Sequence, residues 1–551
     1  MKKLFALALA ILFLAAPVGA ATLRVPQDYP TIQAAVNAAR SGDVVLVAPG
    51  TYGDVVHQPG GMDTTRCAVV MKSGITLRGS GPGVTIIDAD SLGRGIHCGN
   101  VTGSMIRDLT VREAWAEVHG SGIFLTEASS VAIFNCEITH NYDGGIIYFL
   151  QSGGAMSSCT ITNNKAKQGG GLAIEFGSSP QVQFCTITGN QAPMSGGVYI
   201  DGYSAPRISD CTISNNFLNS PNGNGAGLYV KSAQPTFVNI QILDNLGDGR
   251  GGGVLIESEA TVAMTNCLIQ GNSTTSSRGH GGGIYVEYSD VTLQDCTITR
   301  NWIEGAISDG AGIYVYNDLQ VLTIRQCTIA ANSNDGEPTL AGGIACCNTT
   351  PVTIEKSIIA FNDPGKGIEC LDSTSPVISC TDVYGNAAGD QICGTDAGHN
   401  FHMDPLFCDM AQNNFRIQMN SPCFPGRHPD GPHACDYDRI GGQDPGCNPA
   451  GTEDVGTLPG ETRLLGNAPN PFRPNTTIEF EVADPGLVTL RIFDAAGRQV
   501  RLLVNRPYPA GRHRIAWNGR CDTGEFAASG VYFYRLSVNG VENSRRMVLS
   551  R

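Results

Sequence analysis

The chain has little charge, and it has no long apolar run beyond its first residues. Only 16% of its 551 residues are Asp, Glu, Lys or Arg, so it lacks the composition of a chain kept disordered by its own charge. Glycine is abundant instead, with 69 residues, well above the average usage of about 7%. This composition is typical of a fold rich in strands and turns. Nothing after residue 20 is apolar enough to cross a membrane.

The first 20 residues differ from everything that follows. They read MKKLFALALAILFLAAPVGA, with two lysines, a short apolar run and small residues at the end, which predicts a secretory signal peptide over residues 1–20. No cysteine follows the expected cleavage site, so a lipid anchor is not expected. We expect the mature chain to be secreted or displayed on the outer cell surface.

Lysine is absent from residues 461–551, which carry 13 arginines and 8 acidic residues. The whole chain has 36 basic and 50 acidic residues, so the part before residue 461 is strongly acidic. An acidic body disfavours nucleic acid or anionic lipid as a partner.

Six glycine-led blocks recur between Gly169 and Tyr316: GGGLAIE, SGGVYID, GAGLYVK, GGGVLIE, GGGIYVE and GAGIYVY. Each is followed by a second short strand and by a block such as CTITNN, and the period runs from 23 to 31 residues. Such a period indicates a solenoid. Three short strands fit in each period, with no room for a helix.

Two columns fix the register of this repeat. Asparagine recurs five residues after a cysteine or its substitute, which predicts a hydrogen-bonded ladder at a bend, formed by Asn141, Asn164, Asn190, Asn216, Asn245, Asn272, Asn301, Asn332 and Asn362. The cysteines stack in parallel strands, a poor geometry for disulfides. We therefore expect buried free thiols at Cys136, Cys159, Cys185, Cys211, Cys267, Cys296 and Cys327.

A second group of cysteines, from Cys370 to Cys447, lies where the repeat becomes irregular. Disulfides are expected here, as in other exported proteins. The spacing of Cys393, His399, His402 and Cys408 is faintly similar to that of a metal site. A disulfide-stapled loop is the simpler interpretation, so no metal site is assigned.

The repeat resembles the right-handed parallel β-helix of the pectin-lyase-like superfamily. The segment YPTIQAAVNAARSGDVVLVAPGTY (29–52) strengthens the resemblance, because Thr31 reads as an N-cap and the apolar spacing through Ala39 as a short amphipathic helix. In that family such a helix closes the open end of the coil. The resemblance implies an all-β fold, with a right-handed parallel β-helix solenoid over residues 21–446.

The tripeptide Gly279-His280-Gly281 is also found in polygalacturonases, but their accompanying Asn-Thr-Asp, Asp-Asp and Arg-Ile-Lys segments are absent. Without paired carboxylates there is no acid and base for inverting hydrolysis. The repeat itself explains the glycines. Arg250, His280 and Asp309 occupy equivalent places on consecutive turns and are weak site candidates; polar residues on an exposed turn are the alternative.

The first strand of each turn carries two columns that alternation directs outward. One is aromatic and the other largely acidic, which suits a sugar chain, because Tyr offers a flat face and carboxylates accept hydrogen bonds from hydroxyls. The alternative is an ordinary solvated coat. The candidate groove for extracellular polysaccharide comprises Tyr199, Tyr229, Tyr285 and Tyr314 with Glu175, Asp201, Lys231, Glu257 and Glu287.

An enzymatic function of the same groove is the alternative to binding. A polysaccharide lyase or glycoside hydrolase of the pectin-lyase-like fold would need an acid or base, and a lyase needs a cation to neutralise a uronate. Asp201, Glu257 and Glu287 could hold calcium, and Lys231 is the one basic residue of the candidate groove. No complete catalytic motif is present.

The last part of the chain follows a Pro/Gly/Thr linker at residues 447–462. Strands TTIEFEV, LVTLRIFD, RHRIAWNG, GVYFYRLSV and RRMVLS alternate between Gly/Pro/Asn turns and predict a small antiparallel β-sandwich over residues 463–551. NAPNPF and GVYFY resemble the Ig-like C-terminal sorting domain of type IX secretion substrates and the Ig-like domain of flagellar hook-capping proteins. The resemblance implies that outer-membrane secretion machinery is a partner.

Overall fold

The computed structural model describes residues 20–55, 65–116, 121–220, 223–275, 279–305, 309–316, 320–334, 341–348, 351–372, 374–447, 462–468, 470, 472, 476–483, 486–494, 497–508, 511–517, 519–522, 527–539 and 541–550. The chain divides into two compact units, residues 1–447 and 448–551. Nearly all of the predicted signal peptide and linker lies outside the described residues, as do Pro469 and Pro471 of the NAPNPF motif.

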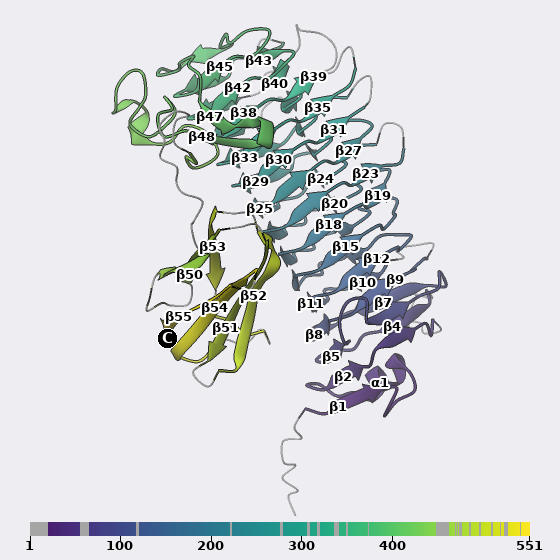
Figure 1. Ribbon diagram of the computed structural model, residues 1–551. Helices are drawn as coiled ribbons and strands as arrows, with labels where there is room; N and C mark the ends of the chain where they lie inside the picture. The colour runs from purple at the N-terminus through teal and green to yellow at the C-terminus, as the bar shows by residue number, and fades with distance from the viewer. Residues whose placement is uncertain are drawn as a thin grey trace, which may run out of the picture. The chain divides into compact units, whose positions relative to one another are not determined.

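The first unit is a right-handed parallel β-helix built from three long sheets (Figure 1). One sheet carries the candidate site and has 12 strands: β4 (Cys67–Val70), β7 (Arg94–Gly99), β10 (Ile123–Thr126), β13 (Ile146–Tyr148), β16 (Leu172–Ile174), β20 (Val198–Ile200), β24 (Leu228–Lys231), β28 (Val254–Glu257), β32 (Ile284–Glu287), β36 (Ile313–Tyr316), β40 (Ala341–Cys347) and β43 (Lys366–Cys370).

The next sheet along each turn has 15 strands: β1 (Thr22–Val25), β2 (Val44–Val47), β5 (Thr76–Arg78), β8 (Thr102–Arg107), β11 (Ser130–Phe134), β14 (Ala155–Ser157), β17 (Gln181–Gln183), β21 (Arg207–Ser209), β25 (Thr236–Val238), β29 (Thr261–Thr265), β33 (Asp290–Gln294), β37 (Leu322–Arg325), β41 (Val352–Glu355), β44 (Val377–Ser379) and β46 (Thr395–Asp396).

The third long sheet has 13 strands: β3 (Gly50–Tyr52), β6 (Thr85–Asp88), β9 (Thr110–Arg112), β12 (Glu137–Thr139), β15 (Thr160–Thr162), β18 (Thr186–Thr188), β22 (Thr212–Ser214), β26 (Gln241–Leu243), β30 (Leu268–Gln270), β34 (Thr297–Thr299), β38 (Thr328–Ala330), β42 (Ile358–Ala360) and β45 (Asp382–Tyr384). The longer connections after the ladder asparagines add a short sheet that the sequence analysis missed: β19 (Gln191–Ala192), β23 (Phe217–Leu218), β27 (Leu246–Gly247), β31 (Ser273–Thr274), β35 (Trp302–Ile303) and β39 (Ser333–Asn334).

A short helix, α1 (Ile32–Ala38), packs at the N-terminal end of the coil, the purple end in Figure 1. The Thr31 side chain accepts a hydrogen bond from the Ala34 amide at 3.1 Å, which satisfies one of the unpaired donors of the first turn. Ile32, Ala35 and Val36 belong to the same buried cluster as the strand interiors. The predicted N-cap and amphipathic helix are confirmed.

The asparagine column forms the predicted ladder. The Asn245 amide nitrogen and its Nδ2 both donate to Asn272 Oδ1, at 3.0 and 2.9 Å, and Nδ2 also donates to the Ile213 carbonyl at 3.0 Å. The same pattern links each asparagine to the next from Asn141 onward, and the side chains are fully buried. Asn386 adds one more rung, since Asn362 Nδ2 donates to its Oδ1 at 2.8 Å.

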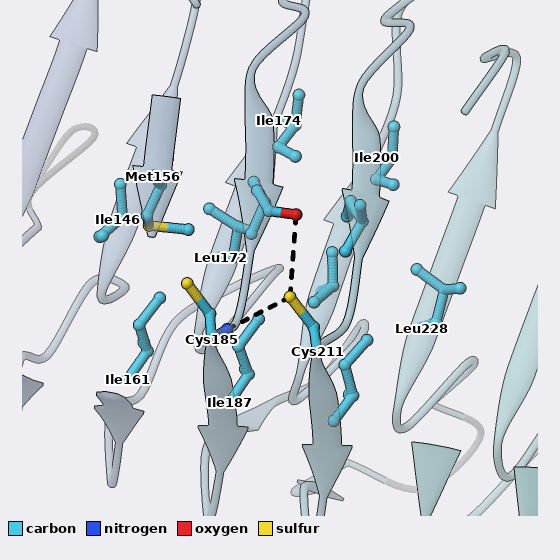
Figure 2. Packing of buried hydrophobic residues seen from close by; sticks show 14 of the residues in the cluster. Ile146, Met156, Ile161, Leu172, Ile174, Cys185, Ile187, Ile200, Cys211 and Leu228 are labelled. Carbon is cyan, nitrogen blue, oxygen red and sulfur yellow. Dashed lines mark hydrogen bonds between the residues drawn. The ribbon is translucent and has the colours of Figure 1, made fainter. Parts of the chain in front are cut away.

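The cysteine column lies inside the coil and is reduced, as predicted. Figure 2 shows Cys185 and Cys211 immediately before the neighbouring strands β18 and β22, among buried aliphatic side chains such as Ile187 and Leu172. The Cys185 amide donates to Cys211 Sγ at 3.4 Å. The thiols fill the corner of the core instead of cross-linking it.

The cysteine-rich end carries the predicted disulfides, which join Cys370 to Cys393, Cys380 to Cys435, and Cys408 to Cys447. Its other elements are β47 (Phe407–Asp409), β48 (Asn414–Ile417) and the 3₁₀ turns η1 (Met410–Gln412) and η2 (Ala434–Tyr437). Phe407, Phe415 and Ile417 pack with Ile358 and Ala360 into a separate core on the outer side of the coil. This segment therefore covers the last turns laterally.

The second unit contains two antiparallel sheets. One has β49 (Arg463–Ala468), β50 (Thr476–Val482) and β53 (Gly511–Trp517); the other has β51 (Gly486–Asp494), β52 (Gln499–Tyr508), β54 (Gly530–Val538) and β55 (Val541–Leu549). Side chains of both sheets, among them Phe480, Trp517 and Tyr534, share one buried cluster. The two sheets thus form a sandwich with its own core.

Candidate functional site

The candidate site lies on the outward face of the 12-stranded sheet, where equivalent residues of successive turns are directly paired. Tyr199 pairs with Tyr229, Tyr229 with Leu255, Leu255 with Tyr285, and Tyr285 with Tyr314. We call Tyr199, Tyr229, Tyr285 and Tyr314 the tyrosine row. Its side chains form a cluster separate from the coil interior, so their outward direction is as predicted.

Three members of the tyrosine row are nevertheless buried and Tyr314 is half-buried, so the expectation of an aromatic surface is wrong for Tyr199, Tyr229 and Tyr285. Tyr199 and Tyr229 are 4% exposed and Tyr285 is 3% exposed. The glycine-led turns lie against these tyrosines: Gly225 has φ +63°, and a Cβ there would stand 2.8 Å from the Tyr229 Cβ. Backbone that only glycine can supply at this distance covers the row.

The carboxylate row, consisting of Glu175, Asp201, Lys231, Glu257 and Glu287, lies over these rings. The Tyr199 hydroxyl donates to Asp201 Oδ2 at 2.7 Å, and the Tyr229 hydroxyl donates to Glu257 Oε1 at 2.5 Å. Glu175 is buried, and this burial raises the pKa of its carboxyl, opposed by a hydrogen bond from Gln168. Asp201, Lys231, Glu257 and Glu287 remain half-buried, so a ligand can reach them.

Arg250, His280 and Asp309 do form one row, as their spacing predicts. The Gly251 amide donates to the His280 carbonyl at 3.0 Å, and the Gly281 amide donates to the Asp309 carbonyl at 3.2 Å. The side chains of Arg250 and His280 contact the tyrosine row. The Arg250 guanidinium lies 5.2 Å from the Tyr285 ring centre and donates to Glu287 Oε2 at 2.9 Å.

His280 stacks on Tyr314 with ring centres 4.4 Å apart. Its Nδ1 accepts the Asp309 amide proton at 3.0 Å, so the neutral ring carries its own proton on Nε2. Burial, aided by the charge of Arg250, lowers the pKa of His280 to about 4. Because the Asp309 amide occupies the Nδ1 lone pair and Nε2 carries a proton, the neutral ring cannot accept a proton from a substrate. His280 therefore acts here as a packed side chain of the turn.

Asp309 is 3% exposed, and burial raises its pKa to about 6. Its Oδ1 accepts the amides of Gly310 and Ala341 at 2.8 and 2.6 Å. Through these two hydrogen bonds the carboxylate stabilises the backbone of the turn. His280 and Asp309 are the two residues of this row whose pKa values are strongly shifted, and neither is placed to touch a substrate.

The residues of the carboxylate row do not fit a calcium site. In the described part of the chain, one set of three or more potential ligand residues converges, and it is His399, His428 and Asp430, far from this face in sequence. Calcium requires six to eight oxygens around one point. The carboxylates of Asp201, Glu257 and Glu287 are instead held on separate partners along the coil.

The grouping at the cysteine-rich end has a structural explanation. His428 is buried, its Nε2 donates to the His399 carbonyl at 2.9 Å, and its Nδ1 accepts the Asp430 amide at 3.1 Å. Both ring nitrogens are thus occupied. Cys393 and Cys408 are in disulfides, so the four residues with metal-like spacing do not come together as ligands.

Sequence reasoning missed the exposed aromatic residues of this face. Phe176, Tyr203 and Tyr288, here called the corner aromatics, follow β16, β20 and β32 at the corner that leads to the 15-stranded sheet. A signal for them exists in the sequence. Each comes one or two residues after a member of the carboxylate row, as in Glu175-Phe176 and Glu287-Tyr288.

A shallow depression of about 460 Å³ lies on another sheet, the 15-stranded one. Threonines of successive turns line it, together with Asp290, whose Oδ1 accepts the Val321 amide at 2.7 Å. Its lining offers hydroxyls but no pair of titratable side chains. We therefore place the candidate site on the 12-stranded sheet.

The chain belongs to the family described as right handed beta helix region, whose model matches residues 68–192, 121–279 and 196–403. A search of curated protein sequences gave no match. In the described residues, no helix has the length and apolar character needed to span a membrane.

Among solved structures, the chain is similar to pectate lyase Pel9A, with 12% identity, 78% of this chain and 97% of that chain covered, and a TM-score of 0.34. It is also similar to the A-module of the mannuronan C-5 epimerase AlgE6 of Azotobacter vinelandii, with 14% identity, coverage of 64% and 93%, and a TM-score of 0.33. These likenesses concern the fold alone.

Proposed function

We propose that the chain is an exported bacterial protein that binds extracellular polysaccharide through the outward face of the 12-stranded sheet. The observation that carries the proposal is the carboxylate row. Asp201 and Glu257 are each fixed by a tyrosine hydroxyl from the row below, and Glu287 by Arg250. Carboxylates held in place on rigid strands are prepared acceptors for sugar hydroxyls, because little side-chain entropy is lost on binding.

One oxygen of each of two carboxylates remains available. Tyr229 occupies Glu257 Oε1 and Arg250 occupies Glu287 Oε2, and within the described ranges no partner is found for Glu257 Oε2 or Glu287 Oε1. The proposal is one of binding without catalysis, because His280 has no free lone pair and Asp309 is committed to backbone amides.

Affinity electrophoresis of the intact protein through gels that contain polysaccharides tests this function. We expect at least one polymer to retard the protein. Replacing Glu257→Gln together with Glu287→Gln keeps the shape but removes two charged acceptors, so affinity should fall about tenfold. Glu137→Gln is the matched control, because Glu137 is also half-buried and accepts from a hydroxyl, that of Thr110 at 2.9 Å, on another sheet. No retardation by any polymer, or equal losses in both variants, would contradict the proposal.

Export is the second part of the proposal, and the signal-like residues 1–20 and the C-terminal sandwich support it. The separate core of residues 463–551 allows the tail to be removed without opening the coil. Deletion of residues 463–551 in the native host should leave a folded β-helix that no longer reaches the cell surface. Normal surface display of the truncated protein would refute the role of the tail as a secretion signal.

A further inference from the structure

Three aromatic rings project from the corner that follows the 12-stranded sheet. Phe176 is 54% exposed, Tyr203 is 82% exposed and Tyr288 is 39% exposed. All three have left-handed backbone, with φ of 53°, 62° and 46°. Bulky side chains are uncommon in this conformation, which glycine or asparagine adopts more easily. The corner thus holds large apolar rings in solvent at positions where small residues would fold as well.

The corner aromatics lie along one hydrogen-bonded ladder, with Ser232 and Ser258 at the corner on the two turns between Tyr203 and Tyr288. The Gly177 amide donates to the Gly202 carbonyl at 2.7 Å, and the Tyr203 amide donates to the Ser232 carbonyl at 2.8 Å. Phe176 and Tyr203 are on adjacent turns, and three strand steps separate Tyr203 from Tyr288, from β20 through β24 and β28 to β32. At a spacing of 4.7–4.9 Å between strands, the aromatic line extends about 14–15 Å beyond Tyr203 along the coil.

This line runs beside the carboxylate row, since Glu175, Asp201 and Glu287 immediately precede the corner. A chain of sugar rings that lies along the coil therefore meets aromatic faces on one side. On the other side it meets the available oxygens of Glu257 and Glu287. Rings and carboxylates together provide the apolar and polar contacts that sugars need.

The carboxylate row and the corner beside it form a strip along the coil. The net negative charge of this strip restricts the chemical class of sugar that it can bind. Arg250, one of the two basic side chains of the strip, is already paired with Glu287. Asp201, Glu257 and the exposed Glu259 thus outnumber the remaining cation, Lys231. A polyuronate or sulfated chain is also negatively charged, so repulsion from these carboxylates opposes its binding. Hydroxyl groups of uncharged sugars instead donate to the carboxylates without meeting repulsion.

We propose that the corner aromatics and the carboxylate row bind a polysaccharide of uncharged sugars, with sugar rings stacked on Phe176, Tyr203 and Tyr288. The inference rests on the proposed function and adds to it the chemical class of the glycan and the residues that contact its apolar faces.

Phe184 provides a matched control on a different corner. It is 59% exposed with φ 54°, almost the same as Phe176. It lies between β17 and β18, so it borders the 15- and 13-stranded sheets and not the carboxylate row. The equivalent positions on the adjacent turns are Ser158 and Asp210, so Phe184 has no aromatic neighbour like the one that Phe176 has in Tyr203.

The test compares the intact wild-type protein with two variants, Phe176→Ala with Tyr203→Ala, and Phe184→Ala. Affinity electrophoresis uses three kinds of polymer: a panel of uncharged glucans, mannans, xylans and galactans; polygalacturonate; and chitosan at high salt. We expect retardation by an uncharged polymer and none by polygalacturonate or chitosan. The double variant should bind that polymer roughly 10–100-fold more weakly, and Phe184→Ala should change affinity less than twofold.

Each contrary result has its own meaning. Tighter binding to polygalacturonate or chitosan would overturn the assignment of uncharged sugars while leaving polysaccharide binding intact. Full retention of affinity in the double variant would overturn the stacking role of the corner. A failure of wild-type protein to bind any polymer would remove the proposed function itself. Thermal unfolding followed by circular dichroism checks that both variants remain folded.

Discussion

Two rows of aromatic side chains, one on the 12-stranded sheet and one at the corner that follows it, have opposite environments. The tyrosine row is covered by the glycine-led turns and is at most 4% exposed at Tyr199, Tyr229 and Tyr285. The corner aromatics, only a few residues further along three of the turns, include Tyr203 at 82% exposure. Both rows point away from the coil interior. Direction relative to the core therefore does not determine which rings a ligand can touch.

The two rows also perform different work. The buried tyrosines pack edge to face or stacked, with ring centres of Tyr199 and Tyr229 5.3 Å apart and those of Tyr285 and Tyr314 5.2 Å apart. Their hydroxyls fix carboxylates above them. The tyrosine row is thus a support for the carboxylate row, whereas the corner aromatics form the surface beside it.

Removal of a buried ring should have the largest effect on stability. We expect Tyr229→Ala to lower the free energy of unfolding by about 3–5 kcal/mol, because it leaves a cavity and removes the partner of Glu257. Tyr203→Ala is the comparison, and it should change stability by less than about 0.5 kcal/mol. Denaturant unfolding measures both. Similar losses in the two variants would mean that the rows do not differ in burial.

The asparagine ladder should be the next most sensitive feature. Asn245→Ala removes the two hydrogen bonds that Nδ2 donates and the two that Oδ1 accepts from Asn216 in a fully buried column, so we expect a loss of about 1–3 kcal/mol. Asn219→Ala, at an exposed position three residues after Asn216 and outside the ladder, should be nearly neutral. Denaturant titration measures the free energy of unfolding of both variants. An Asn245→Ala variant as stable as wild type would contradict the ladder.

The stack that ends in His280 should respond to pH. Its pKa is lowered to about 4 in the folded protein, against about 6.5 in an unfolded chain. Between these values the unfolded state binds more protons, so acidification should destabilise the fold. We expect wild type to lose about 1–2 kcal/mol relative to His280→Gln between pH 7 and pH 5.

The comparison with His280→Gln is needed because Asp309 changes the stability with pH in the opposite direction. Burial raises its pKa to about 6, so its contribution to stability increases as pH falls from that value. Unfolding measured at both pH values for wild type and His280→Gln separates the two residues. A difference between the proteins that does not change with pH would show that His280 is not neutral and buried.

Much of the coil was predictable because its determinants are local and repeated. The spacing of Asn141 to Asn362 defines the ladder, and the stacked cysteines follow from the same register. Asn386 was missed because Thr381 replaces the usual cysteine five residues before it. The short fourth sheet was missed because its two-residue strands, such as Phe217–Leu218, have no periodicity of their own.

The candidate site was less predictable, since exposure depends on the path of the connecting turns. Alternation correctly directs Tyr229 outward, but only the approach of Gly225 shows that the ring is covered. The corner aromatics have no alternating partners, because Phe176 and Tyr203 stand where the strand has already ended. Left-handed corners are set by the whole coil and not by the residue itself.

The most direct test of this account is hydroxyl-radical footprinting of the intact protein with and without a bound uncharged polysaccharide. We predict rapid oxidation of Phe176, Tyr203 and Tyr288 in the free protein and strong protection in the complex. Phe184 should be oxidised equally in both, and Tyr229 slowly in both. Protection of Phe184 instead of Tyr203, or oxidation of Tyr229 as fast as that of Tyr203, would contradict the account.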